Sequence, residues 1–367
     1  MVILPEANIS VAIASQMIPG TEINLLFLVF LGLAIGIVSG FVGVGGGFIM
    51  TPSLIILGFP ANLAVGTSLA WVMGNSIIGT LRHRQLGNVD MKLGTLMTVC
   101  MVGGVEIGVR FLNRARDTGL ADTAVLTVSM CCLLLVGGYI FWESSRTKAK
   151  LDNTSVSKEK LPADVGAFSI ATRVQGIKIP PMIHFAKSRV TISLWLLIGI
   201  GIFIGILAGF MGVGGGFIMV PSLIYLIGLP SFMAVGTDLF QIIFSAAFGS
   251  VRHTMSGNVI IFAAFIMILG SSIGTQFGAL ATRYLRGIAM RYVLAATILV
   301  AFLGSTLELI NILSESAISW LQTAGVVVTL SGLGVIIAIL VGLFVAAVRY
   351  RNSLNIPRWI ESLVAKD

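Results

Sequence analysis

The sequence predicts an all-α polytopic membrane protein. It consists of two inverted repeats of about five membrane segments each, with short broken helices, plus one extra C-terminal span. The composition excludes a water-soluble surface, because 56% of the 367 residues are hydrophobic, only 10% are charged and the mean hydropathy is +1.01. In addition, a glycine-rich motif occurs twice, and basic residues gather between its two copies and after the last apolar stretch.

The two copies of the motif are nearly identical. Residues 40–52 read GFVGVGGGFIMTP and residues 209–221 read GFMGVGGGFIMVP. Two further pairs of segments match in the same order: GFPANLAVGT at 58–67 with GLPSFMAVGT at 228–237, and GTLRHRQLGNV at 79–89 with GSVRHTMSGNV at 249–259. Chance similarity between apolar helices does not preserve Arg-His and Gly-Asn-Val at matched positions. The chain therefore contains an internal duplication.

Apolar stretches about as long as a bilayer requires predict the membrane spans. They are residues 24–41, 63–80, 94–109 and 124–142 in the first copy, residues 192–210, 232–250, 259–280 and 292–307 in the second, and an unpaired stretch at 324–348. Between the first two spans of each copy lies a shorter apolar stretch, at 48–57 and 217–227. With each short stretch counted as one of a crossing pair, a copy has five segments. An odd number inverts the second copy relative to the first.

The distribution of Lys and Arg predicts the orientation. These residues are frequent between the copies and after the last span, which places both regions in the cytoplasm. Arg110, Arg114 and Arg116 fall outside in this arrangement and run against it. The predicted regions are an extracytoplasmic N-terminal tail (1–22), membrane repeat 1 (23–142), a cytoplasmic basic linker (143–190) treated as a loop, membrane repeat 2 (191–308), an extracytoplasmic loop with the extra span (309–348) and a cytoplasmic tail (349–367).

The motif glycines predict a substrate site. They are Gly43, Gly45, Gly46 and Gly47 in the first copy and Gly212, Gly214, Gly215 and Gly216 in the second. Neither copy has the Gly-Lys-Ser/Thr ending of a nucleotide-binding loop. In a membrane, such glycines let one helix end at mid-depth and a short helix begin, with its first backbone N–H groups unpaired. Two facing breaks then form an anion site. The alternative is close helix packing through small residues.

A polar stripe runs along the third segment of each copy, at the helical spacing i, i+4, i+8. It consists of Thr67, Trp71 and Asn75 in the first copy and of Thr237, Gln241 and Ser245 in the second. Because a stripe facing lipid is costly, it is expected to face the interior, where the glycine breaks open. The predicted substrate-binding residues are therefore the eight motif glycines together with Thr67, Asn75, Thr237 and Gln241. The alternative is hydrogen bonding between helices without a ligand.

Two acids are candidates for carrying a coupling proton. Asp238 stands where the first copy has Ser68, and Glu106 corresponds to Gln276. Ionisable groups at this depth are rare and usually functional. The alternative for Glu106 is a salt bridge with the nearby Arg110, and the alternative for Asp238 is a structural hydrogen bond. Nothing in the sequence separates the two interpretations of Asp238.

Other chemically versatile residues predict no catalytic centre. Arg82-His83 and Arg252-His253 lie at segment ends, where we expect them to anchor at the membrane surface, and the alternative is a funnel that attracts anions. The three His are scattered, and Cys100, Cys131 and Cys132 fall in predicted spans. We therefore expect no enzymatic activity, no cofactor and no metal site. The net charge of +8 reflects topology rather than nucleic-acid binding. The expected partners are a small anionic substrate and the lipid bilayer.

The doubled GxxGxGGGFxxxP motif, followed each time by AVGT, Arg-His and Gly-Asn, resembles the TauE/SafE sulfite exporter family of membrane permeases. The resemblance covers nearly the whole chain apart from the tail, the linker and the last span. It implies a multi-pass secondary transporter of the cell (inner) membrane, with Pro52 and Pro221 as helix-breaking prolines. Its expected substrates are small sulfur-containing anions such as sulfite, sulfoacetate or other organosulfonates. The alternative is a passive anion channel of the same fold, which needs no coupling carboxylate.

Overall fold

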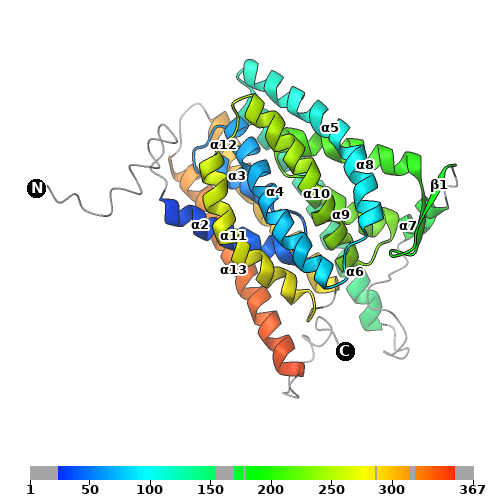
Figure 1. The fold of residues 1–367 in the computed structure, drawn as a ribbon. Coiled ribbons are helices and arrows are strands. Elements are labelled where there is room, and N and C mark those ends of the chain that lie inside the picture. The colour runs from blue at the N-terminus through cyan, green and yellow to red at the C-terminus, as the bar shows by residue number, and fades with distance from the viewer. Residues whose placement is uncertain (1–23, 154–168, 177–178, 286, 315–318, 352–367) are drawn as a thin grey trace, which may run out of the picture.

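In the computed structural model, the chain forms a bundle of helices with one small β-hairpin at its edge (Figure 1). The structure describes residues 24–153, 169–176, 179–285, 287–314 and 319–351. Within these residues, nine helices are long and apolar enough to cross a membrane. One shorter apolar helix begins within each of the two glycine motifs. The prediction of an all-α polytopic membrane protein is confirmed.

The elements of the two copies follow the same order. The first copy contains α2 (Leu25–Val42), α3 (Gly47–Ile56), α4 (Ala61–Gln85), α5 (Met91–Asp117) and α6 (Ala121–Asn153). The second contains α8 (Leu194–Met211), α9 (Gly216–Pro221) with a π-helical turn (Ser222–Ile227), α10 (Ser231–Met255), α11 (Ile261–Ala281) and α12 (Gly287–Leu313). The chain continues with α13 (Ser319–Arg351).

Each glycine motif breaks a helix as predicted. Helix α2 ends at Gly43, whose φ is 77°, and α3 begins after Gly46, whose φ is 83°. Helix α8 ends at Gly212 and α9 begins after Gly215, with φ values of 72° and 85°. These left-handed conformations are strained for residues with a Cβ atom, which explains why glycine occupies all four positions.

Close backbone contacts pair helices of different copies. A Cβ atom on Gly36 of α2 would lie 2.8 Å from the Cα atom of Ser271 on α11. Gly32 lies against Met267 and Gly40 against Thr275, so α2 and α11 run parallel. The same packing joins the equivalent helices α5 and α8, where Gly201, Gly205 and Gly209 lie against Cys100, Met101 and Val105. Small residues therefore hold these pairs together, as is common between helices in membranes.

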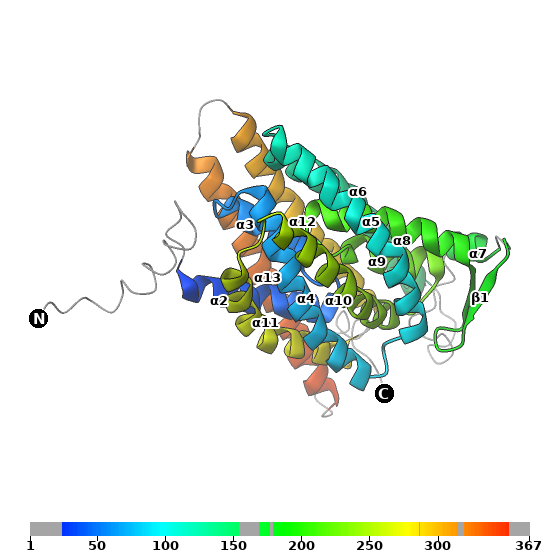
Figure 2. The same ribbon diagram turned by 45° about the horizontal axis from the view of Figure 1, so that its top comes forward.

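Helices α4 and α10 lie in the middle of the bundle, between the α2–α11 pair and the α5–α8 pair (Figures 1 and 2). Gly79 of α4 lies against Leu239 of α10, and Gly249 of α10 lies against Leu69 of α4. The two helices therefore run antiparallel, although they are equivalent in the two copies. An inverted repeat requires this direction. The orientation of the copies in a membrane stays a prediction.

The linker 143–190, predicted to be a loop, contains regular secondary structure. Helix α6 extends to Asn153, and α7 (Ser169–Gln175) is followed by a hairpin of β1 (Met182–Phe185) and β2 (Val190–Ser193). The hairpin forms because Phe185, Val190 and Ile192 are buried against the helices. Two strands of four residues each, with polar residues among them, are too short to stand out in a polar linker. The predicted N-terminal tail and most of the cytoplasmic tail lie outside the described residues.

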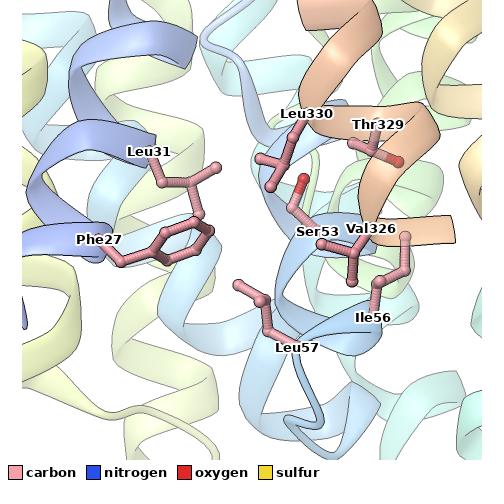
Figure 3. Close-up of a pocket in the computed structure, with 8 residues that line it drawn as sticks. All are labelled: Phe27, Leu31, Ser53, Ile56, Leu57, Val326, Thr329 and Leu330. Carbon is pink, nitrogen blue, oxygen red and sulfur yellow. The ribbon is translucent and has the colours of Figure 1, made fainter. Parts of the chain in front are cut away.

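The additional helix α13 packs against α12, α2 and α3 at the edge of the bundle. Figure 3 shows a small pocket where α13 meets α2 and α3. It is lined by Phe27, Leu31, Ser53, Ile56, Leu57, Val326, Thr329 and Leu330. This lining is apolar except for two hydroxyl groups and carries no charge. It does not suit an anion.

The glycine contacts make a prediction about stability. In α5, a Cβ atom on Gly104 would collide with the carbonyl oxygen of Ile202, whereas a Cβ atom on the adjacent Gly103 would meet nothing within 4 Å. We expect Gly104→Ala to lower the free energy of unfolding by about 1–3 kcal/mol through overpacking. Gly103→Ala is the matched control and should be neutral or slightly stabilising. Thermal unfolding of the purified variants measures both effects, and equal midpoints would contradict this packing.

Candidate functional site

The two glycine breaks contact each other at the centre of the bundle. A Cβ atom on Gly47 would lie 2.7 Å from the Cα atom of Val213 in the other break. A Cβ atom on Gly216 would lie 2.5 Å from the carbonyl oxygen of Val44. The aromatic rings that follow the two breaks, Phe48 and Phe217, stack with their centroids 5.9 Å apart. The chain thus brings together two motifs that are far apart in the sequence.

The contact between the breaks is closed to water. Gly45 and Gly214 both face the side chains of Val72 on α4 and Ile242 on α10, with Cβ positions 3.0–3.4 Å from their methyl groups. Val72 and Ile242 are fully buried. The other two positive-φ glycines at the helix starts point elsewhere, Gly46 toward Trp71 and Ile35, and Gly215 toward Ile204 and Met101. Side chains of α4 and α10 therefore fill the space beside both breaks.

Asn75 holds the first break. Its amide nitrogen donates to Ser39 Oγ at 2.8 Å and to the carbonyl oxygen of Gly45 at 3.2 Å. Its amide oxygen accepts from the Thr275 hydroxyl on α11. Asn75 is fully buried and so links α2, the break and α11. In the second copy, the equivalent Ser245 donates only within its own helix, to the carbonyl oxygen of Ile242.

Asp238 and Gln241 face the second break. Asp238 is fully buried, and its Oδ1 accepts from Gln241 Nε2 at 2.6 Å. Its other oxygen, Oδ2, lies 2.7 Å from the position that a Cβ atom on Gly216 would occupy. Among the described residues, neither Asp238 Oδ2 nor Gln241 Oε1 has a hydrogen-bond partner. The predicted coupling acid therefore lies at a glycine break with one oxygen unpaired.

The two threonines of the polar stripe bond to loops of the opposite copy. Thr67 Oγ1 accepts from the backbone N–H of Ile260, and Thr237 Oγ1 accepts from the backbone N–H of Asp90, both at 2.9 Å. These amides belong to the loops that precede α11 and α5. The hydroxyl groups of Thr67 and Thr237 thus bond to these loops, while Val65 and Val235, two residues earlier, pack on Gly212 and Gly43 of the breaks. Each threonine holds a loop of the other copy.

Glu106 lies in an ion-pair network. Its carboxylate accepts two hydrogen bonds from Arg252 on α10, at 2.6 and 2.9 Å, and one from Arg110 at 2.8 Å. Its side chain is 23% exposed, and it ties α5 to α10 rather than facing a break. This geometry favours the salt-bridge interpretation of Glu106.

The two histidines of the repeated Arg-His pairs are buried, so the expectation that they anchor at the membrane surface is wrong for them. His83 Nε2 lies 3.0 Å from the carbonyl oxygen of Gly40, and His253 Nε2 lies 3.1 Å from that of Gly209. A carbonyl oxygen only accepts, so each imidazole donates. Each histidine thereby satisfies a carbonyl in the last turn of the helix before the break, where no amide of the same helix is available.

The repeated AVGT and Gly-Asn sequences pack against each other across the two copies. A Cβ atom on Gly66 would collide with the carbonyl oxygen of Asn258, and one on Gly236 would collide with that of Asn88. The AVGT of each copy therefore packs on the Gly-Asn loop of the other. The repeats indicate the duplication, but their contact with each other was not predicted from the sequence. The recurrence of both segments in each copy is the feature that could have indicated this contact.

Comparison with known proteins identifies the family. A family model described as sulfite exporter TauE/SafE matches residues 28–306. The chain belongs to the TauE/SafE family. Over 271 residues it is 27% identical to the probable membrane transporter protein YunE of Bacillus subtilis, covering 71% of this chain and 89% of the relative. Over 205 residues it is 26% identical to the probable membrane transporter protein MJ0441 of Methanocaldococcus jannaschii, covering 54% and 61%.

The TauE/SafE match begins in α2 and ends in α12, so it contains both glycine breaks and leaves α13 outside. The family resemblance inferred from the motifs is confirmed, and the chain is a multi-pass membrane transporter of this family. No solved structure matches the chain. Among the described residues, no group of three or more His, Cys, Asp or Glu that could hold a metal ion occurs.

The ion-pair geometry makes a prediction about Glu106. We expect Glu106→Gln to lower the free energy of unfolding by about 0.5–1 kcal/mol, because a partly exposed pair contributes little. Transport against a gradient should persist, since the carboxylate faces Arg252 rather than a break. Arg110→Gln is the matched control and should have no effect, because its side chain is 74% exposed. Thermal unfolding and uptake into proteoliposomes are the measurements. Normal stability with lost accumulation would make Glu106 a coupling group.

Proposed function

We propose that the chain is a secondary transporter of small sulfur-containing anions such as sulfite, sulfoacetate or other organosulfonates. The observation that carries the proposal is the direct contact of the two glycine breaks between the antiparallel helices α4 and α10. The name of the matching family points to sulfite as the model substrate. We place the protein in the cell (inner) membrane with the linker 143–190 in the cytoplasm and the two copies inverted, which the antiparallel α4 and α10 support.

The substrate site of this proposal lies between the two breaks. Backbone N–H groups at the start of α3 have no partner within the helix, and an anion is stabilised by such groups. Asn75 bonds the first break and Gln241 bonds Asp238 at the second, while Thr67 and Thr237 support the site by holding the loops. Because Val72 and Ile242 close the centre, the described structure corresponds to an occluded state. Alternating separation of α4 and α10 then exposes the site to one side at a time.

Asp238 carries the coupling charge in this proposal. A carboxylate beside an anion site repels the substrate unless its charge is neutralised, so binding of a cation and binding of the anion favour each other. A proton is the simplest such cation. The first copy has Ser68 at the equivalent position, so one chain has one coupling site.

The substrate site is tested by binding. Purified protein should be stabilised in a thermal-shift screen by sulfite, thiosulfate or organosulfonates, and not by carboxylates or phosphate. Gly214→Ala should weaken this binding about tenfold or more, which is about 1.4 kcal/mol, because the added methyl group faces Val72 and Ile242 between the breaks. Gly257→Ala is the matched control, with a similar φ of 69° and open space around its Cβ position. Equal affinities for the two variants would place the site elsewhere.

Coupling is tested separately with Asp238→Asn, which removes the charge and keeps the shape of the side chain. We expect this variant to exchange substrate across proteoliposome membranes but to lose accumulation against a gradient. The neutral amide can neither bind nor release a cation during the cycle. Unchanged accumulation would remove Asp238 from the mechanism. If the wild-type protein itself equilibrates substrate without accumulating it, the passive channel is the correct function.

A further inference from the structure

A groove with a volume of about 180 Å³ lies on the surface of the bundle, where α4, α10 and the start of α5 meet. Its α4 side is formed by Ile77, Leu81 and Arg84, which follow one face of the helix at the spacing i, i+4, i+7. Ile77 and Leu81 are 41% and 57% exposed, so the groove opens to the outside of the bundle. At 1.5 Å per residue, the helix rises about 10 Å from Ile77 to Arg84.

The opposite side of the groove is formed by Phe240 and Ile243 of α10, and Met91 at the start of α5 completes it. The ring of Phe240 is held in place, because it packs on Gly94 of α5 and makes an edge contact with the ring of Phe244 at a centroid distance of 5.5 Å. These side chains present hydrocarbon to the groove. The lining therefore suits an apolar chain rather than a small anion with its hydration water.

Arg84 gives the groove one charged end. It lies in the last turn of α4 and is exposed, and its guanidinium group makes no hydrogen bond or ion pair with any described residue. The acid of the loop that follows, Asp90, is 3% exposed and accepts hydrogen bonds from the Ser188 hydroxyl and the backbone N–H of Leu93. The positive charge of Arg84 can therefore pair with an anionic group from outside the chain.

This end of the groove lies on the side of the bundle that carries the linker. Lys187 of the hairpin donates to the carbonyl oxygen of Val89, and Lys92 donates to the carbonyl oxygen of His184 in the hairpin. The proposed topology places the linker in the cytoplasm, so Arg84 lies at the cytoplasmic end of α4. The cytoplasmic leaflet carries anionic lipids, which attract basic side chains beside a membrane helix.

We propose that this groove binds one anionic phospholipid, with the phosphate group on Arg84 and an acyl chain between α4 and α10. The planar guanidinium group suits phosphate oxygens, and the apolar lining suits the chain below them. The lipid then contacts both central helices. The other copy lacks this combination, because Thr254 stands at the position of Arg84 and Ala70 at the position of Phe240.

The head group is tested by native mass spectrometry of the purified full-length protein, titrated with phosphatidylglycerol or with phosphatidylcholine of the same acyl chains. Wild-type protein should bind one phosphatidylglycerol more tightly than phosphatidylcholine. Arg84→Gln should weaken phosphatidylglycerol binding about fivefold, which is about 1 kcal/mol, and leave phosphatidylcholine binding unchanged. Arg114→Gln is the matched control and should bind both lipids normally. Arg114 is also an exposed arginine in the last turn of a long helix, outside the groove.

The acyl chain is tested by a second pair of variants, checked first by size-exclusion chromatography. Leu81→Trp fills the groove and should weaken the binding of both lipids. Val251→Trp changes the equivalent residue of the other copy, which is 58% exposed, and should have no effect.

Equal affinity of the wild-type protein for the two lipids overturns the proposal, as does unchanged phosphatidylglycerol binding in either Arg84→Gln or Leu81→Trp. Displacement of the lipid by inorganic phosphate or sulfite at constant ionic strength also overturns it, because the groove would then be a site for small anions. The proposed transport function does not depend on this groove. Loss of the lipid site therefore leaves the test of the glycine breaks unaffected.

Discussion

Backbone polar groups inside a membrane need partners within the protein, and the rest of this structure depends on how that requirement is met at the two interrupted helices. Each interruption frees carbonyl and amide groups at mid-bundle. His83 and His253 donate to carbonyl groups of the preceding helix, and Asn75 donates to the carbonyl of Gly45. These buried polar side chains lie on α4 and α10. The two central helices are therefore fixed in position by the breaks that they enclose.

The sequence predicts the features that depend on local pattern. Hydropathy locates the nine long helices of the described residues, and the glycines at 43, 46, 212 and 215 locate the helix ends because these positions have left-handed backbone. Contacts between the copies cannot be predicted from local sequence patterns. The roles of Thr67 and Thr237 as holders of loops, the pairing of Glu106 with Arg252 and the burial of both histidines depend on residues more than 40 positions away. The hairpin at 182–193 escapes prediction because its strands are short and only half apolar.

The duplication has produced two halves with different chemistry. In the first copy, the break is held by Asn75, whose side-chain amide bonds to Ser39, Gly45 and Thr275. In the second copy, among the described residues, Ser245 bonds within its own helix, and Asp238 and Gln241 each keep an oxygen without a partner. The helix after the second break also changes to a π-helical turn at Ser222–Ile227, where the first copy stays α-helical. The two copies therefore differ in the polar side chains that face their breaks.

The reciprocal packing of AVGT on Gly-Asn has a consequence for biosynthesis. Gly66 and Thr67 meet their partners only on the loop before α11, and Gly236 and Thr237 meet theirs on the loop before α5. The first copy leaves the ribosome long before those partners exist. Its central helix enters the bilayer with the hydroxyl group and the glycine surface unmatched until about 190 further residues have been made. The contacts of Gly66 and Thr67 therefore form only after the loop before α11 has been synthesised.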